Sequence, residues 1–514
     1  MINHWCPAVA PRRLRIGVLE LLSGEVPSGF ASRVYHLLIR RQFYSVMPQT
    51  VSAWCRRDGH TVFYATYYGQ AAPERLLPED LDIVFVSAFT EAAGLAFAVA
   101  KIYRTRKTRT VLGGPHARAF PRDALRFFDI VVVDCTEEMV RDIVAGHYPP
   151  GSTITGPRGG GGFRIPLLEE RRIDIDKARL MHRRLAKLSL VPLMSSTGCP
   201  YACNFCSDWN HPFAPRNPDD LRADLEFAAD AFPGQLLVFY DPNFGVNFDR
   251  TIGLMEAVPK AHRNPFIIES SLSILKPQRL GRLREANCVF VAPGIESWQD
   301  YGNKSATGQS RSRDKYVRIA EHFQLLKAYI PGLQANFMFG HDSDKGREPI
   351  ELTIEFIRQF PTVFPKIAIP IALGGTPLRD ELKAQGRLLP LPPVFYFNPL
   401  PSLLMKNYPM AEYFTGWMEM FSAVTERSRL SALALSSMSL PMRAAYLLGV
   451  VDVAGFIRIL RQFRDRVTGD PEVARFNSGR SAAIPEYYHH RLGRRLQRYA
   501  ELLSRREREE IAVD

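Results

Sequence analysis

Cysteine is scarce in this chain, supplying seven of the 514 residues. Four of the seven (Cys6, Cys55, Cys135 and Cys288) are scattered without a pairing pattern, so the sequence predicts no disulfide framework. Long apolar stretches are also lacking, because no uninterrupted run approaches the ~20 residues of a membrane-spanning helix. Met1–Pro11 contains no basic segment followed by an apolar one, and therefore predicts no signal peptide. Together these absences favour a reducing, cytoplasmic location and no transmembrane segment.

Acidic residues are outnumbered, with 53 Asp and Glu against 66 Lys and Arg, which gives a net charge of +13. Such an excess can indicate a nucleic-acid partner. Much of it, however, lies in short arginine runs without interleaved aromatic residues, so exposed helix faces explain it better than nucleic acid does. Attraction to an anionic membrane surface, as a peripheral contact, or to an acidic substrate stays open.

The remaining three cysteines stand close together. Cys199, Cys203 and Cys206 have a C-x3-C-x2-C spacing, which chance would produce on the order of 10⁻³ times in such a chain. The three thiolates could hold zinc, with His211 as a fourth ligand. They could also hold a [4Fe–4S] cluster, which usually takes four thiolates. With only three cysteines nearby, such a cluster would keep one iron open for a substrate or cofactor.

Five short β-rich segments alternate with helical segments in the first part of the chain. This alternation predicts a doubly wound, Rossmann-like parallel sheet, which binds ligands at the carboxyl ends of its strands. At one such end, Gly113 and Gly114 would let the backbone approach a flat ligand closely, because neither residue has a Cβ atom. A plain tight turn is the alternative. The expected strands are Leu14–Leu21, Thr61–Tyr64, Asp82–Ser87, Thr110–Leu112 and Asp129–Asp134.

A second alternation of strands and helices follows a linker. The glycine- and proline-rich stretch Tyr148–Gly162 predicts flexible chain, and Ile165–Leu190 is basic and mostly helical, as a bridge between domains would be. The pattern beyond it predicts a partial β/α barrel of the TIM type, with its ligand site in the carboxyl-end loops. The expected strands are Val191–Ser195, Gln235–Tyr240, Phe266–Ser270, Val289–Pro293, Gln334–Phe339 and Lys366–Leu373.

The chain beyond Pro377 is predicted to be helical. It ends in a basic amphipathic helix, Pro485–Arg508, with Leu492, Leu496, Tyr499 and Leu503 on one side. We expect this stripe to pack on the barrel as a cap, and a lid over a lipophilic substrate pocket is the alternative. The predicted division of the chain is a Rossmann-like domain at 1–148, a linker and bridging helix at 149–189, a barrel at 190–380 and a helical region at 381–514.

The cysteine loop resembles the cluster loop of the radical S-adenosylmethionine (SAM) enzymes, in its spacing and in the aromatic Phe205 before the third cysteine. In that family the open iron binds the amino and carboxylate groups of SAM, and an electron from the cluster cleaves SAM to a 5′-deoxyadenosyl radical. Further motifs resembling the family stand at the following strand ends, such as Gly294-Ile-Glu-Ser297. The resemblance implies that SAM is contacted by Tyr240, Asp241, Asn243, Glu269, Ser271, Glu296 and Gly340.

A doubly wound sheet directly ahead of such a loop resembles the cobalamin (B12)-binding domain of B12-dependent radical SAM proteins, where Gly-Gly-Pro-His commonly follows the fourth strand. Two features depart from the pattern. Asp58-Gly-His60 begins like the Asp-x-His-x-x-Gly cobalt signature, but Phe63 stands at its glycine position, so we expect His60 to be structural. The turn Asp134–Glu137 replaces a Gly-Glu-Gly-Glu-like turn. The resemblance implies cobalamin contacts by Ser87, Gly113, Gly114, His116 and Thr136.

The resemblance implies an enzyme that uses a [4Fe–4S] cluster, SAM and cobalamin, most simply as a C-methyltransferase acting on an unactivated carbon of a small-molecule or lipid-like substrate. Acidic, basic and nucleophilic side chains do not react with an unactivated C–H bond, so cofactors must carry out the chemistry. The cluster would take its electron from a donor of the flavodoxin or ferredoxin type. A B12-dependent radical cyclase or rearrangement enzyme is the catalytic alternative, and a non-catalytic cobalamin or iron–sulfur sensor is the other.

Overall fold

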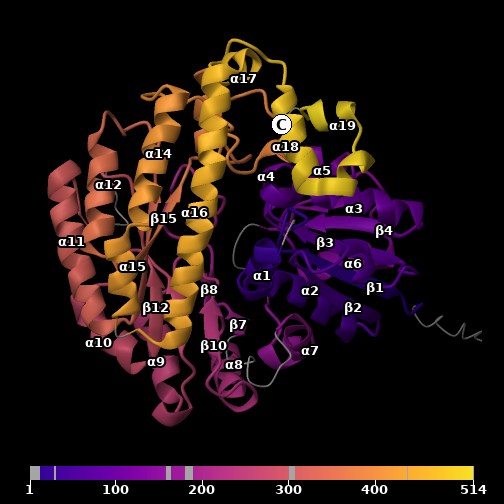
Figure 1. The fold of residues 1–514 in the computed structure, drawn as a ribbon. Coiled ribbons are helices and arrows are strands. Elements are labelled where there is room, and N and C mark those ends of the chain that lie inside the picture. The colour runs from indigo at the N-terminus through magenta and orange to yellow at the C-terminus, as the bar shows by residue number, and fades with distance from the viewer. Residues whose placement is uncertain are drawn as a thin grey trace, which may run out of the picture.

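The structure is a computed structural model that describes residues 12–27, 30–157, 164–179, 189–299, 307–436 and 438–512. Two parallel β-sheets lie side by side with helices packed against them, and a C-terminal set of helices runs along both (Figure 1). The predicted glycine-rich part of the linker (159–162) and residues 180–188 of the predicted bridge lie outside the described residues.

The first sheet is parallel throughout, with the spatial strand order β2-β1-β3-β4-β5-β6. The first described strand, β1, lies in the interior of the sheet, because it pairs with both β2 and β3, and the chain then winds outward to either side. Its strands are β1 (Arg15–Leu21), β2 (Thr61–Tyr67), β3 (Ile83–Ala88), β4 (Arg109–Gly113), β5 (Ile130–Val132) and β6 (Ser152–Ile154), and its helices are α1 (Phe30–Leu38), α2 (Val46–Arg57), α3 (Ala93–Thr105), α4 (Pro115–Ala119), α5 (Pro121–Leu125) and α6 (Glu137–Ala145).

The expectation of five strands in this sheet was wrong, because β6 makes a sixth. This strand lies within the segment predicted to be a linker, yet it pairs in parallel with β5. Val133 N–H donates to Ile154 O at 2.8 Å, and Gly156 N–H donates to Asp134 O at 2.9 Å. Strand prediction relies on a run of apolar residues. This strand has only three residues and lies next to a glycine-rich stretch, so it contains no such run. The first sheet therefore extends beyond residue 148, and the four-part division of the chain stays a prediction.

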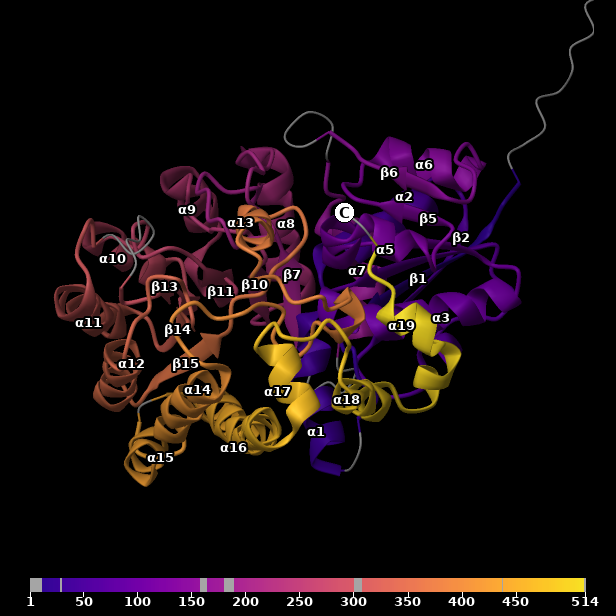
Figure 2. The same cartoon turned by 90° about the horizontal axis from the view of Figure 1, so that it is seen from above.

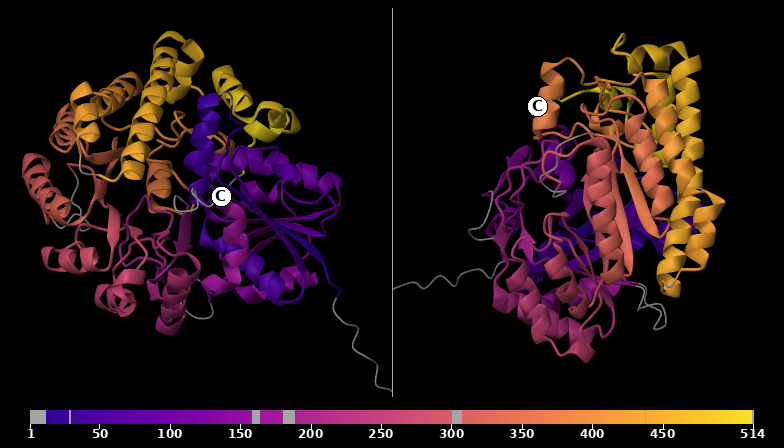
Figure 3. Two further views of the ribbon diagram at one scale, coloured as in Figure 1. Left: turned by 60° about the horizontal axis from the view of Figure 1, so that its bottom comes forward. Right: turned by 90° about the vertical axis from the view of Figure 1, so that its left-hand side faces the viewer.

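The second sheet is an open part of a barrel. Its strands lie in the order β7-β10-β11-β12-β14-β15, with the short β13 beside β14, and every pairing among them is parallel. Helices cover its outer side (Figure 3). The strands are β7 (Leu190–Leu193), β10 (Leu236–Phe239), β11 (Phe266–Glu269), β12 (Cys288–Ala292), β13 (Gly294–Glu296), β14 (Gly332–Met338) and β15 (Val363–Ala368), and the helices are α8 (Pro218–Ala231), α9 (Phe248–Ala257), α10 (Pro277–Glu285), α11 (Ser312–Tyr329), α12 (Glu348–Gln359) and α13 (Pro377–Ala384). The predicted fold class is confirmed.

One helix, α7 (Leu168–Ala178), joins the two sheets. The guanidinium of its fully buried Arg171 donates to Gln49 Oε1 on α2 at 3.0 Å and to Pro192 O on β7 at 3.2 Å. Arg56 on α2 also forms an ion pair with Asp174. A buried guanidinium is tolerated only when its N–H groups find acceptors, so α7 fixes the position of one sheet relative to the other.

The C-terminal helices first pack against the barrel. Tyr446 O–H donates to Leu333 O on β14 at 2.6 Å, and the buried Arg429 donates to Val363 O on β15 at 2.8 Å. Among the described residues, no helix has the length and apolarity needed to cross a membrane. The helices are α14 (Met410–Val424), α15 (Arg427–Ala434), α16 (Leu440–Gly469) and α17 (Pro471–Asn477).

The prediction of one continuous helix at Pro485–Arg508 was wrong. The segment forms α18 (Glu486–Leu496), a 3-10 stretch at Gln497–Leu502 and α19 (Arg505–Glu509). The chain turns at Gln497, whose φ of +50° lies in the left-handed region. This single local break is not visible in a pattern of apolar residues.

The apolar stripe of this segment is buried as expected, but against the first sheet instead of the barrel. A Cβ atom added to Gly94 of α3 would lie 3.1 Å from Leu496. The hydroxyl of Tyr499 donates to Glu74 at 2.7 Å, and Lys101 of α3 pairs with Glu507 at 2.8 Å. The end of the chain therefore packs over α3, as Figure 2 shows.

Candidate active site

The three motif cysteines lie on a loop closed by a short antiparallel pair, β8 (Ser196–Thr197) and β9 (Ala214–Pro215). Inside the loop, Cys199 N–H donates to His211 O at 3.0 Å. Gly198 has a φ of +66°, and an added Cβ would lie 2.1 Å from Pro212 O, so only glycine fits there. The loop is thus held tightly at its start.

The thiols of Cys199, Cys203 and Cys206 are partly exposed. Cys206 N–H donates to Cys203 O at 3.1 Å, and the backbone N–H of Asp208 donates to Cys206 Sγ at 3.4 Å. Three soft thiol ligands on one loop, with a backbone donor aimed at a sulfur, fit an iron–sulfur cluster, whose potential depends on such hydrogen bonds.

His211, the fourth ligand in the zinc alternative, lies at the boundary between the two sheets. Within the described ranges, no three His, Cys, Asp or Glu side chains are arranged to hold a single metal ion. The Nε2 atom of His211 lies 3.9 Å from Asp134 Oδ1, across this boundary.

Asp241, predicted to contact SAM, lies beneath the cysteine loop and holds it. Its carboxylate accepts hydrogen bonds from Ser195 N–H at 2.9 Å, Ser195 O–H at 2.6 Å and Ser196 O–H at 2.6 Å. Burial raises the pKa of Asp241, and these hydrogen bonds oppose the rise. The two serines stand at the start of the loop, with Thr197 and Gly198 between them and the first cysteine, so the carboxylate fixes where the loop leaves β7. Sequence reasoning missed both serines.

A second network connects the loop to the ends of β10 and β11. Tyr201, between the first two cysteines, shares a 2.6 Å hydrogen bond with Ser273, which lies 3.0 Å from the hydroxyl of Ser271. Ser271 N–H donates to Asn243 Oδ1 at 2.9 Å. The structure therefore brings together Asn243 and Ser271, both predicted SAM contacts, and adds Tyr201 and Ser273, which sequence reasoning missed.

The other predicted SAM contacts lie along the same carboxyl edge of the second sheet. Glu269 ends β11 and is exposed, whereas Tyr240, after β10, has a buried hydroxyl. Glu296 ends β13 with a φ of +61°. Gly340 has a φ of +100°, and its N–H donates to a carboxylate at 2.9 Å, that of Asp344. Their roles toward SAM stay predictions.

The predicted cobalamin contacts lie at the carboxyl edge of the first sheet, with one exception. A Cβ added to Gly113 would meet nothing within 4 Å, whereas at Gly114, with a φ of +87°, it would lie 2.9 Å from Ser87 Oγ. Thr136 caps α6 by accepting from Met139 N–H at 3.3 Å. The edge thus offers open backbone at Gly113, which suits a flat ligand.

His116 is the exception, because its side chain is fully buried between the rings of Phe97 and Phe120. Burial lowers its pKa to about 3. The imidazole therefore faces the core and no open ligand surface. His60, expected to be structural, accepts a hydrogen bond from Leu14 N–H at 3.2 Å beside the start of β1.

The carboxyl edges of the two sheets are in direct contact through Arg118. This residue lies on α4, just after the Gly-Gly-Pro-His turn, and pairs with Asp134 after β5 at 3.2 Å. It also pairs with Asp208 of the cysteine loop at 2.8 Å. Sequence reasoning missed Arg118, although its position two residues beyond His116 was a usable signal.

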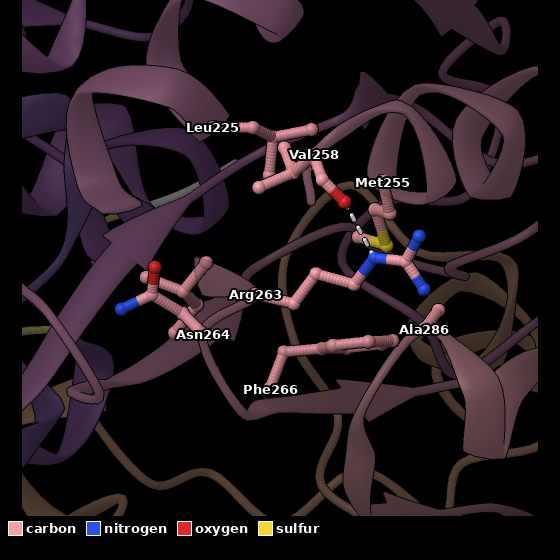
Figure 4. Close-up of a pocket in the computed structure, with 8 residues that line it drawn as sticks. Leu225, Met255, Val258, Arg263, Asn264, Phe266 and Ala286 are labelled. Carbon is pink, nitrogen blue, oxygen red and sulfur yellow. Dashed lines mark hydrogen bonds between the residues drawn. The ribbon is translucent and has the colours of Figure 1, made fainter. Parts of the chain in front are cut away.

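A small cavity lies elsewhere in the barrel. It is lined by residues at the amino ends of β10 and β11, including Leu237 and Phe266, and by the stem of Arg263, which donates to Val258 O at 2.7 Å (Figure 4). Its place at the opposite ends of these strands separates it from the cysteine loop.

Comparison with known proteins identifies the barrel. Residues 193–356 match the radical SAM superfamily. The chain is 25% identical over 334 residues to bacteriochlorophyllide d C-8(2)-methyltransferase of Chlorobaculum tepidum, covering 60% of this chain and 69% of that protein. It is 26% identical over 294 residues to hopanoid C-2 methylase of Rhodopseudomonas palustris, covering 54% of this chain and 53% of that protein.

Solved structures share this fold over most of the chain. The radical SAM methyltransferase TsrM of Kitasatospora setae, solved with cobalamin and a [4Fe–4S] cluster, aligns with a TM-score of 0.56 at 13% identity, over 87% of this chain and 99% of that one. OxsB, a cobalamin-dependent SAM radical enzyme solved with aqua-cobalamin, aligns with a TM-score of 0.57 at 13% identity, over 95% and 80%. At these identities the likeness establishes a common fold.

Proposed function

We propose that the chain is a cobalamin-dependent radical SAM C-methyltransferase, because residues 193–356 match the radical SAM superfamily and the fold is shared with cobalamin-dependent enzymes that use SAM. When bound, the [4Fe–4S] cluster, SAM and cobalamin supply a radical source and a methyl carrier. Cys199, Cys203 and Cys206 would hold the cluster. A one-electron donor of the flavodoxin or ferredoxin type would serve as the partner.

The observation that carries this proposal is the contact between the two carboxyl edges. Arg118 pairs with Asp134 at the edge of the first sheet and with Asp208 of the cysteine loop. A ligand seated over the open backbone at Gly113 would therefore lie near a cluster held by the loop. Methyl transfer to an unactivated carbon requires that both cofactors reach one substrate atom, which is a positioning problem for the protein.

The chain's own residues would do that positioning. Asp241 fixes the base of the cysteine loop, and the Tyr201–Ser273–Ser271–Asn243 network ties the loop to the next two strand ends. Hydrogen bonds of this kind fix the positions of side chains as precisely as a group-transfer reaction requires. The exposed Glu269 would be free to meet SAM.

The named relatives support the substrate class and the reaction. One methylates bacteriochlorophyllide d and another is a hopanoid methylase, and both are methyltransferases by name. We therefore propose that the substrate of this chain is a mainly apolar organic molecule. The same names favour methyl transfer over the cyclase or rearrangement alternative.

Anaerobic reconstitution with iron, sulfide and cobalamin tests the proposal. The wild type should bind cobalamin, cleave SAM to 5′-deoxyadenosine under reduction, and pass deuterium from methyl-labelled SAM to an apolar metabolite supplied in extract. Cys203→Ala should abolish SAM cleavage. Cys288→Ala removes a buried thiol outside the motif, on β12, and should retain it.

Each failure has a distinct meaning. SAM cleavage without cobalamin binding would remove the methyl-transfer proposal and leave a radical SAM enzyme of another type. Cleavage retained by Cys203→Ala would show that the loop is not the cluster site.

A further inference from the structure

Helix α16 carries large apolar side chains that are exposed. Leu440 is 76% exposed and Val451 is 66% exposed, and Leu447 is exposed between them. Leu435, just after α15, is 88% exposed. Single exposed apolar residues are ordinary, but a contiguous group needs an explanation.

These residues share one face of α16. Leu440, Ala444, Leu447 and Val451 follow one another at intervals of four, three and four residues and are all exposed, which places them on one stripe of an α-helix. The opposite face is buried against the barrel through Tyr446, Val450, Val453, Leu460 and Phe463. An ordinary surface helix is polar on the side away from its core, so the exposed stripe is an unpartnered apolar face.

The N-terminal helix α1 and the 3-10 turn that follows it lie on the same side of the molecule as α16 (Figures 1 and 2). Electrostatic interaction of Asp452 on α16 with Arg40 places the two elements near each other. Leu37 of α1 is exposed, and Phe43 of the turn is 52% exposed. We call this combined area the α1–α16 surface: Leu37, Phe43, Leu435, Leu440, Leu447 and Val451.

The same elements are strongly basic. Residues Phe30–Leu38, Arg40–Phe43 and Leu440–Gly469 contain eight arginines and two aspartates. Arg33, Arg458 and Arg461 are exposed. Arg458 continues the apolar stripe, seven residues beyond Val451, so positive charge stands at the end of an apolar face.

We propose that the α1–α16 surface binds the surface of an anionic lipid bilayer, with α16 lying in the plane of the interface. Apolar side chains on one helix face, with arginines beside them, suit the acyl boundary and the lipid phosphates respectively. The net charge of +13 attracts the whole chain to the same surface. The inference stands apart from the proposed reaction, although it would bring the protein to the phase in which an apolar substrate dissolves.

Co-sedimentation of the full chain with vesicles tests this inference. We expect binding to vesicles of phosphatidylcholine with one third phosphatidylglycerol, much weaker binding to phosphatidylcholine alone, and a loss at high salt. Leu440→Glu combined with Val451→Glu should reduce partitioning at least about tenfold. Arg33→Ala combined with Arg458→Ala should reduce it by about fivefold for each arginine.

The control is Val317→Glu, which puts one added negative charge, against two in the double glutamate variant, at an apolar side chain, 45% exposed, on α11. It should bind as the wild type does, and circular dichroism should show that all variants are folded. Equal binding by Val317→Glu and the double glutamate variant would overturn the proposal. So would a wild-type dimer in analytical ultracentrifugation that the double glutamate variant dissociates, because the surface would then join two copies of this chain.

Discussion

Glu20 and Asp241 are two buried carboxyl groups held in the same way in the two sheets. Glu20 on β1 accepts hydrogen bonds from Ser45 N–H at 2.8 Å, Ser45 O–H at 2.6 Å and Tyr64 O–H at 3.0 Å. Asp241 accepts from one serine N–H and two serine hydroxyls at nearly the same distances. Burial raises the pKa of both groups.

The difference lies in what each carboxyl group holds. Ser45 immediately precedes α2, a helix of the scaffold, whereas Ser195 stands at the start of the segment that carries the cysteines. The same set of donors therefore stabilises the fold in one sheet and the candidate site in the other. A buried carboxyl group at a strand end is therefore not by itself evidence of a ligand contact. Its role depends on the segment that its hydrogen bonds hold in place.

Removing the two carboxyl groups should separate these roles, with the largest effect at Asp241. Asp241→Ala leaves three buried donors without an acceptor, each costing about 1–3 kcal/mol, and frees the base of the cysteine loop. We expect iron content after reconstitution to fall sharply and SAM cleavage to drop by more than about 100-fold. Glu20→Ala, the matched control, should lower the melting temperature but keep the iron content. An Asp241→Ala protein with full iron and weakened SAM binding would instead make Asp241 a direct SAM contact.

The pH dependence of stability sharpens the comparison further. Burial raises the pKa of Glu20 to about 7 from 4.5, so the folded state holds this proton more tightly than the unfolded state. The resulting stability is present below about pH 4.5 and is lost as the pH rises through about 7, a change of about 3 kcal/mol.

Glu20→Gln removes that titration. The stability of Glu20→Gln relative to wild type should therefore increase between pH 4.5 and 7 and level off above, as measured by unfolding of the apoprotein at each pH. A constant difference between Glu20→Gln and wild type would mean that Glu20 is ionised across this range.

The sequence allowed the fold class to be predicted because both sheets are parallel and alternate with helices. β3, for instance, is buried at five of its six positions and reads as a continuous apolar run. Strand β6 and the helix break at Gln497 were not predicted, because each involves only a few residues. Such segments are shorter than the length at which hydrophobic periodicity is informative. The three cysteines were predicted as the cluster site from their spacing, and that assignment stays a prediction.

The residues that hold the site in place were harder to predict from the sequence. Ser195, Ser273 and Arg118 act through partners distant in the sequence, and only the folded chain shows which hydroxyl or carboxylate each one meets. His116 was misleading for the same reason. Its place in a familiar turn suggested a ligand contact, whereas the turn directs the imidazole into the core against Phe97 and Phe120.

Arg118→Ala tests the contact between the two sheets and should have the smallest effect on stability. Its ion pairs are partly exposed and contribute about 1 kcal/mol or less, so the variant should fold and retain both cofactors. The cysteine loop and the edge at Asp134 would be held less firmly relative to each other. We therefore expect the ratio of 5′-deoxyadenosine to methylated product to rise by about fivefold, with Arg318→Ala on α11 as the control. An unchanged ratio would mean that Arg118 joins the sheets without aligning their cofactors.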